Sequence, residues 1–151
     1  MHKILFICHG NICRSPMAEF LLQDMVQKQG LAEQFEIASA ATSREELGNP
    51  VHYGTQRKLA ELGICTAGKY ARQVTKADYR YYDYLIIMDR NNQRNLERLI
   101  GEDVEQKVSL LLAYAGRPGQ SIADPWYTGD FELTYADVKA GLEGLLKYLG
   151  Y

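Results

Sequence analysis

The sequence predicts an α/β fold built on a parallel sheet. Short apolar runs alternate with longer segments of helical period along the whole chain, which is the pattern of repeated strand–helix units. Residues that cap helices precede several of the helical segments, and glycines follow them. The length of 151 residues, of which 46% are hydrophobic, fits one soluble domain with a core of its own.

The first predicted strand covers residues 3–8, a largely apolar run of the kind that is buried on both faces of a parallel sheet. The first helix is predicted over 16–29. Ser15-Pro16 places a cap residue before a proline of the first turn, and Gly30 stands where the helix ends.

The same signals mark the remaining elements. A second strand is predicted at 35–40, and Asn49-Pro50 and Gly63 delimit a second helix at 50–62. The later elements are predicted as a strand at 84–89, a helix at 91–100, a strand at 107–111 and a helix at 131–149.

The longest predicted loop runs from about 114 to 130. A loop of that length in a compact domain is more often functional than idle. Ligands of open parallel sheets bind beyond the carboxyl ends of the strands, where Cys8, Asp89 and this loop all emerge. We therefore expect these three places to converge.

Charge and cysteine content exclude several classes of protein. A formal net charge of −2 provides no global basic field for nucleic acid, so any anion site has to be local. No segment has the length of a secretory signal or a membrane span, and we expect a cytoplasmic protein without membrane contact. Cys8, Cys13 and Cys65 lack the spacing of a zinc site or a disulfide framework, and no histidine spacing indicates a metal.

The segment from Cys8 to Pro16 carries the strongest functional signal. Its order of strand end, tight loop and helix start directs backbone N–H groups and the positive end of a helix dipole at one point. Phosphate or another oxyanion can bind there. The candidates for binding this anion are Arg14 and the loop residues His9, Gly10, Asn11, Ile12, Cys13 and Ser15.

Cys8 is predicted to be a nucleophile and Arg14 a phosphate clamp. A helix N-terminus and a nearby cation stabilise a thiolate, so this cysteine needs no histidine base. A guanidinium matches two phosphate oxygens at once, whereas lysine would bring a single point charge. An isolated cysteine at a strand end is more often part of the core, but the fixed offsets to Gly10, Asn11 and Ser15-Pro16 favour catalysis.

Three loop residues carry further expectations. Asn11 can bond across the loop and hold a strained turn, since asparagine tolerates a left-handed backbone. Ser15 can cap the helix and donate a hydrogen bond to the sulfur of Cys8 when that sulfur leaves. Cys13 has two interpretations of comparable weight, packing in the core or a redox role in which a bond to Cys8 protects the nucleophile.

The long loop contains a candidate general acid, Asp124 of Asp124-Pro125-Trp126-Tyr127. Transfer of phosphate to sulfur needs a protonated leaving group, and the same aspartate can later activate water against the cysteinyl-phosphate. Pro125 biases Asp124 towards an extended backbone, which directs the carboxyl. Trp126 and Tyr127 form either an apolar wall for an aromatic substrate or a cover over the edge of the core.

Together these segments resemble the low-molecular-weight protein tyrosine phosphatase family over essentially the whole chain. Cys8-His-Gly-Asn-Ile-Cys-Arg-Ser-Pro16 resembles the phosphate loop of the family, and Asp124-Pro125-Trp126-Tyr127 resembles its acid loop. Ser39-Ala-Ala-Thr-Ser43 and Leu47-Gly-Asn-Pro50 are similar to the segment after its second strand. Unrelated phosphatases share the cysteine–arginine spacing, but its position at the very N-terminus, with the acid far downstream, is specific to this family.

The resemblance implies a three-layer fold with a central four-stranded parallel sheet, helices on both faces, and neither a metal nor an organic cofactor. One departure from the family is Glu45, which stands where many members carry an aromatic residue at the substrate lip. The resemblance implies roles for six residues: Cys8 as nucleophile, Arg14 as phosphate clamp, Asp124 as general acid, and Asn11, Ser15 and Ser39 as loop supports.

We therefore expect a protein tyrosine phosphatase that acts on tyrosine-phosphorylated proteins, because a phenol leaves more easily than a serine alkoxide. Family members that hydrolyse phosphoarginine tend to carry threonine where Ile12 stands. Related arsenate reductases need further cysteines, which Cys65 alone does not supply. A phosphocarrier domain has no use for a general acid, and a phosphate-dependent binding module would lack Cys8 or Asp124.

Overall fold

The computed structural model describes residues 1–151 and contains a four-stranded sheet in which all neighbouring strands are parallel. The strand order is β2-β1-β3-β4, with β1 (His2–Cys8), β2 (Phe35–Ala41), β3 (Tyr84–Ile87) and β4 (Val108–Leu110). Cys8 pairs with Ala41, and Ile7 pairs with Ile87, so the carboxyl ends of the three strands meet at one edge. The predicted parallel α/β sheet is confirmed.

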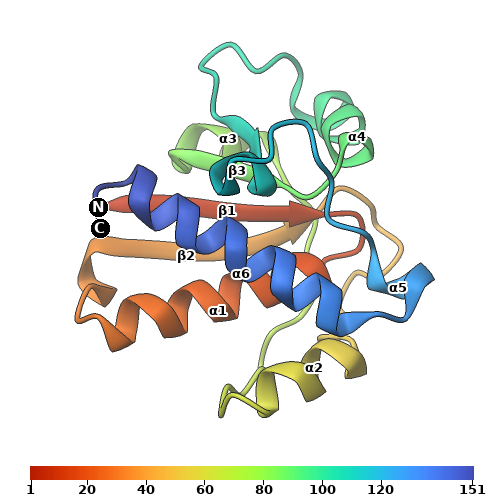
Figure 1. Ribbon diagram of the computed structural model, residues 1–151. Helices are drawn as coiled ribbons and strands as arrows, with labels where there is room; N and C mark the ends of the chain where they lie inside the picture. Colours follow the sequence, from red (N-terminus) through yellow and green to blue (C-terminus); the bar gives the residue numbers. More distant parts are fainter.

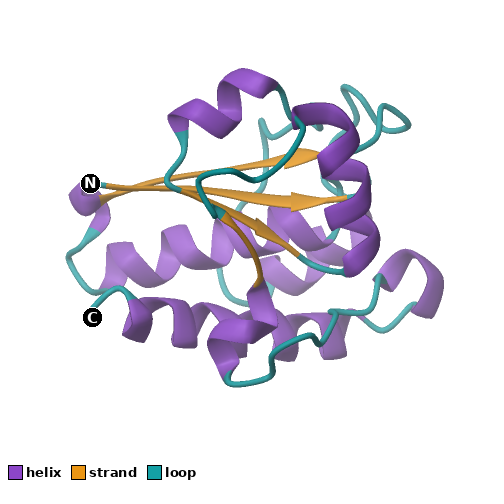
Figure 2. Cartoon of the chain, turned by 90° about the horizontal axis from the view of Figure 1, so that it is seen from above, coloured by secondary structure: helices purple, strands orange, loops and turns teal.

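Helices cover both faces of the sheet, as expected (Figures 1 and 2). Helices α1 and α6 lie on one face with α2 packed against them, and α3 and α4 lie on the other. None of the helices is both long and apolar enough to cross a membrane. The elements are α1 (Arg14–Lys28), η1 (Ala32–Gln34), α2 (Tyr53–Ala60), α3 (Lys76–Tyr81), α4 (Arg90–Ile100), η2 (Leu111–Ala115), α5 (Pro125–Thr128) and α6 (Phe131–Tyr148).

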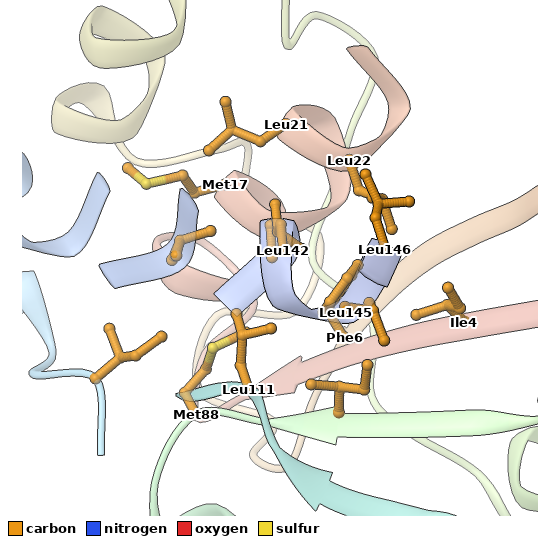
Figure 3. Close-up of a cluster of buried hydrophobic side chains, with 14 of the residues drawn as sticks. Ile4, Phe6, Met17, Leu21, Leu22, Met88, Leu111, Leu142, Leu145 and Leu146 are labelled. Carbon is orange, nitrogen blue, oxygen red and sulfur yellow. The ribbon is translucent and has the colours of Figure 1, made fainter. Parts of the chain in front are cut away.

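Alternate residues of β1 contribute to two hydrophobic cores, because neighbouring side chains of a strand point to opposite faces. Ile4, Phe6 and Cys8 belong to the larger core together with α1 and α6 (Figure 3). Leu5 and Ile7 belong to a smaller core with α3 and α4. Burial of each of these large side chains stabilises the fold by roughly 1.5–3 kcal/mol, so the strand that ends in Cys8 is held firmly.

Helix α1 begins at Arg14, two residues before its predicted start, and Ser15 lies inside its first turn. The predicted capping role of Ser15 is therefore wrong. The N-cap is Cys13, whose side chain makes no capping hydrogen bond. Ser15 does not cap the helix because its hydroxyl contacts Cys8 Sγ and Asn11 Nδ2 instead.

Helix α2 begins at Tyr53, later than predicted from Asn49-Pro50. Pro50 instead forms an isolated bridge with Tyr70. The helix is capped by His52, whose ring nitrogen Nδ1 accepts the N–H of Gly54 at 3.0 Å. The Asn-Pro signal therefore marks a turn into an extended segment rather than the first turn of the helix.

Two short α-helices were not predicted, because neither is long enough to show a periodic pattern. Helix α3 starts with a capping box formed by Thr75 and Asp78. Helix α5 lies within the predicted long loop and has Asp124 as its N-cap and Pro125 in its first turn. The acid loop is thus held by helical geometry.

The third strand ends at Ile87, earlier than the predicted 84–89. The chain leaves the sheet because the Asn92 side chain accepts the backbone N–H groups of Met88 and Asp89, at 3.0 and 3.1 Å. The other predicted strands and helices agree with the structure to within one residue at each end.

Gly144 of α6 is predicted to tolerate no side chain. A Cβ added there would overlap the backbone carbonyl of Tyr114. Gly144→Ala should lower the free energy of unfolding by about 1–3 kcal/mol through overpacking, although alanine favours a helix by about 1 kcal/mol. Urea unfolding measures this change, with Glu143→Ala at the exposed neighbouring position as the control. A Gly144→Ala protein as stable as the parent would contradict the packing of α6 on η2.

Asp78 is predicted to make stability depend on pH. Arg72 donates to both of its carboxylate oxygens, at 2.9 and 3.1 Å. Burial alone would raise the pKa of Asp78, but the bonds from Arg72 and from the Thr75 N–H outweigh it and lower that pKa. A carboxyl whose pKa falls on folding stabilises the native state above its unfolded pKa of about 3.9, and this contribution is lost as the pH drops through the folded value.

Asp78→Asn should therefore be less stable than the parent at pH 7, and the difference should shrink below about pH 4. Urea unfolding of both proteins between pH 7 and pH 2.5 measures this. A difference that stays constant over that range would show that the charge of Asp78 contributes nothing.

Candidate active site

The loop between β1 and α1 turns its carbonyl oxygens outward and its N–H groups inward. In a trans peptide the N–H points away from the preceding C=O, so an outward carbonyl directs the next N–H into the loop. Four carbonyls accept hydrogen bonds from outside the loop. The carbonyls of Cys8 and His9 accept the N–H groups of Thr42 and Ser43, at 2.9 and 3.0 Å. The carbonyl of Ile12 accepts the N–H of His52 at 2.8 Å, and that of Cys13 accepts the Thr55 hydroxyl at 3.3 Å. The N–H groups that follow these carbonyls therefore point away from the outside partners, towards the inner side of the loop.

Asn11 makes this turn possible. Its φ of +59° is the expected left-handed backbone, and its side chain is almost fully buried. The amide Oδ1 accepts the N–H of Arg72 at 3.2 Å. The amide Nδ2 donates to the hydroxyls of Ser15 and Ser39, at 2.8 and 2.9 Å. The side chain therefore ties the loop to β2, to α1 and to the segment before α3.

Cys8 lies at the carboxyl end of β1, buried, with its sulfur beside the first turn of α1. Its Sγ is 3.0 Å from the hydroxyl of Ser15. The N-terminus of α1 has no side-chain cap, so the N–H groups of its first turn and its positive dipole end remain directed at the loop. These donors can stabilise either a thiolate or a bound phosphate.

Arg14 is buried to all but 2% of its surface and lies between two carboxylates. Its Nη1 donates to Asp89 at 2.7 Å and to the carbonyl of Ile122 at 2.8 Å, and its Nη2 lies 3.4 Å from Asp124. Burial alone would lower the pKa of the guanidinium, but the charges of Cys8 and Asp89 raise it above its ordinary value. The remaining donor, Nε, is buried and has no partner.

Asp124 is the N-cap of α5, and its capping hydrogen bond holds the side chain in place. Its Oδ1 accepts the N–H of Trp126 at 3.0 Å, while its Oδ2 faces Arg14. The residue has the extended backbone expected before a proline, with ψ of 115°. Its carboxyl therefore has one oxygen anchored in the acid loop and one directed to the site.

A cavity of about 100 Å³ opens above the loop. Trp126 and Tyr127 are 56% and 83% exposed, so of the two interpretations of these rings, the structure favours a pocket wall over a cover for the core. The lining residues are Cys8, His9, Gly10, Ile12, Cys13, Glu45, Glu46, Asp124, Trp126 and Tyr127. The cavity thus gathers eight sequence candidates with two glutamates, while Asn11, Arg14, Ser15 and Ser39 lie beneath or behind it.

Acidic side chains line the mouth of the cavity. His9 Nε2 lies 2.9 Å from a carboxylate oxygen of Glu45 in an exposed contact, so the His9 side chain points to the rim. Glu46 was not predicted. A Cβ added at Gly10 would lie 3.3 Å from its Cγ, which shows that Glu46 packs directly on the loop.

Cys13 differs from Cys8 in its surroundings. Burial, and after it the neighbouring Cys8, raises the pKa of the Cys13 thiol well above its ordinary value. The side chain packs in a small cluster with Ile12 and Ala71. Cys8 and Cys13 are not joined by a disulfide, and the redox role of Cys13 stays a prediction.

Sequence reasoning missed the contacts of three buried or half-buried groups around the loop. Asp89 was expected near the site, but its ion pair with Arg14 was not. No role at the site was predicted for Glu19 or Lys69. Ser39 Oγ donates to Glu19 at 2.5 Å, and Lys69 Nζ lies 3.0 Å from the same carboxylate oxygen. A glutamate on the buried side of a predicted helix was the only available signal. No group of three or more His, Cys, Asp or Glu side chains suited to a metal ion is present.

Comparison with known proteins points to one family. Residues 3–151 match the model of a family described as low molecular weight phosphotyrosine protein phosphatase. The chain is 40% identical over 147 residues to the low molecular weight protein-tyrosine-phosphatase YfkJ of Bacillus subtilis, covering 97% of this chain and 94% of that protein. It is 42% identical over 137 residues to the low molecular weight phosphotyrosine protein phosphatase of Gallus gallus, covering 88% and 86%.

Solved structures show the same fold. The crystal structure of Bacillus subtilis YfkJ matches with a TM-score of 0.93 at 39% identity, covering 99% of this chain and 94% of that chain. Vibrio vulnificus Wzb in complex with benzylphosphonate matches with a TM-score of 0.77 at 25% identity, covering 97% and 96%. The chain therefore belongs to the low molecular weight phosphotyrosine protein phosphatase family.

Proposed function

We propose that this protein hydrolyses phosphotyrosine through a cysteinyl-phosphate formed on Cys8. The observation that carries the proposal is the unpartnered Nε of the buried Arg14, beside a loop whose N–H groups face inward. A buried donor left without a partner costs about 1–3 kcal/mol. A phosphate oxygen satisfies that donor and the loop N–H groups together, and Wzb, a structural relative, is seen with a phosphonate.

In the first step, the Cys8 thiolate attacks phosphorus and the bond to the phenolic oxygen breaks. The protonated carboxyl of Asp124 donates its proton to that oxygen, so tyrosine leaves as a neutral phenol. Arg14 and the loop N–H groups hold the three remaining phosphate oxygens, whose charge shifts during transfer. Asp124 is suited to this step because its free oxygen already faces the guanidinium that binds the phosphate.

In the second step, water attacks the phosphorus of the cysteinyl-phosphate and the phosphorus–sulfur bond breaks. The Asp124 carboxylate, ionised by the first step, takes a proton from that water. Cys8 leaves as a thiolate, inorganic phosphate is released, and the enzyme is restored. The Ser15 hydroxyl, 3.0 Å from the sulfur, can donate to the thiolate at this moment.

An aromatic phosphate ester fits this site best. A phenol has a pKa of about 10, so it needs less help to leave than an alkoxide does. Trp126 and Tyr127 form an apolar wall above Asp124, and Ile12 lies in the floor, without a hydroxyl. We infer that the substrates are tyrosine-phosphorylated proteins and that the enzyme works in the cytoplasm, where its three free cysteines stay reduced.

Phosphate release from matched phosphotyrosine, phosphoserine and phosphoarginine peptides tests the proposal. The parent protein should release phosphate selectively from the phosphotyrosine peptide without added metal. Cys8→Ser should release no more than buffer does, whereas Cys65→Ser, at the exposed cysteine, should retain full activity. Preference for phosphoarginine, or no release from any peptide, would overturn the proposed substrate class.

Asp124→Asn tests the general acid. The asparagine can still cap α5 but has no proton to donate, so the loss should grow with the basicity of the leaving group. We expect a loss in kcat of about 100-fold or more with phosphotyrosine, and a much smaller loss with aryl phosphates whose phenols are strong acids. Steady-state kinetics over a series of substituted phenyl phosphates measures the trend. Equal losses along the series would remove Asp124 from this role.

A further inference from the structure

The polar side chains behind the phosphate loop form one continuous network that ends in two groups of fixed polarity. At one end, the backbone N–H of Arg72 can only donate, and Asn11 Oδ1 accepts it at 3.2 Å. At the other end, the Glu19 carboxylate can only accept while it is ionised, and Ser39 Oγ lies 2.5 Å from it. Because both ends are fixed, the groups between them have little choice of which donates and which accepts each hydrogen bond.

The number of hydrogens on each group, counted from the Arg72 end, fixes the direction of the hydrogen bonds in the middle of the network. Because Asn11 Oδ1 faces the N–H of Arg72, its Nδ2 faces the two serines, and the amide cannot be flipped without losing this bond. Nδ2 carries two hydrogens and has two neighbours, Ser15 Oγ at 2.8 Å and Ser39 Oγ at 2.9 Å. Both hydroxyls therefore accept from Asn11.

Each serine must then direct its own proton elsewhere. Ser39 donates to Glu19. Ser15 is left with one neighbour in reach, the Cys8 sulfur at 3.0 Å, so its hydroxyl donates to that sulfur. This direction suits a thiolate, which accepts hydrogen bonds and has none to give.

Lys69 is placed to keep this pattern intact. Its Nζ lies 3.0 Å from Glu19 Oε1 and donates to the backbone carbonyl of Ser39 at 3.0 Å. The side chains of Lys69 and Glu19 are only 15% and 10% exposed, and Gln23 is the other polar neighbour of the carboxylate, at 3.4 Å. A buried carboxylate without a cation tends to take up a proton, and it would then be able to donate.

We propose that Glu19 and Lys69 are positioning residues for the nucleophile: the lysine-paired carboxylate fixes the direction of the hydrogen bonds through Ser39, Asn11 and Ser15 towards Cys8. If Glu19 donated to Ser39, the Ser39 proton would turn to Asn11, which would have to flip its amide. Ser15 would then donate to Asn11 Oδ1 rather than to the sulfur. The inference rests on the proposed role of Cys8 as the nucleophile.

The test is Lys69→Met, with the rate of Cys8 alkylation by iodoacetamide followed against pH in a Cys65→Ser background. The alkylated cysteine is identified by peptide mass spectrometry. A hydrogen bond to a charged group contributes about 1.5–3 kcal/mol, so the alkylation rate at low pH should fall by about 10- to 150-fold and the midpoint should move to higher pH. The titratable groups near Cys8, namely Arg14, Cys13 and Asp124, are the same in both proteins.

The same substitution in a Ser15→Ala background separates positioning from a general loss of structure. There the last link to the sulfur is absent, so Lys69→Met should change the alkylation profile no further. Lys69→Arg, which restores a cation, should recover most of the parent profile. Phosphatase assays of the single variant should show the loss in kcat with little change in KM, because Arg14 and the loop N–H groups still bind the phosphate.

Asp24→Asn, at an ion pair with Lys28 on the same helix as Glu19, is the matched control and should leave the profile unchanged. If Lys69→Met fails to fold, the neutral pair Glu19→Gln with Lys69→Met takes its place. The inference is overturned if Lys69→Met leaves the pH profile of Cys8 alkylation unchanged, or if it shifts that profile equally in the parent and in the Ser15→Ala background. Alkylation needs no substrate, so this result is independent of whether the peptides are hydrolysed.

Discussion

The conformation of the loop after β1 is the constraint on which the rest of the site depends. A chain that leaves a strand and enters a helix within a few residues can gather N–H groups at one point only if its carbonyls turn outward. That turn needs a left-handed residue, and Asn11 supplies it at φ +59°. A lone left-handed asparagine is costly, but the bonds from Arg72 and to Ser15 and Ser39 compensate this cost. Strand β2, helix α1 and the segment before α3 thereby hold one loop.

The electrostatics of the site are local. The chain carries a net charge of −2, so nothing in its overall field attracts an anion. Attraction comes from Arg14 and the inward N–H groups. Asp89 and Asp124 both approach that guanidinium, but they are held differently. Asp89 accepts the N–H of Asn92 at 2.7 Å and caps a long helix, whereas Asp124 caps a four-residue helix at the rim. Both contact the arginine, but only Asp124 lines the cavity.

The fold and most of the site followed from patterns that are local in sequence. The alternation of buried strands and amphipathic helices indicated the parallel sheet, and the order of strand, loop and helix around Cys8 indicated an anion site before any contact was known. Expectations failed where several short-range signals competed. Ser15 looked like a helix cap, but its hydroxyl is used by Cys8 and Asn11. Helices α3 and α5 are shorter than two turns and left no period to detect.

The sequence by itself determined the chemical types at the site: a cysteine at the end of a buried strand, an arginine at the start of a helix, and an aspartate before a proline in a long loop. Only the tertiary structure decided which distant groups meet them. Asp89 reaches Arg14 because β1 and β3 are neighbours in register, and Glu19 reaches Ser39 because α1 packs on β2. Lys69 joins that carboxylate from a separate loop. Such contacts depend on strand order and packing, which no local pattern encodes, because they join residues far apart in the chain.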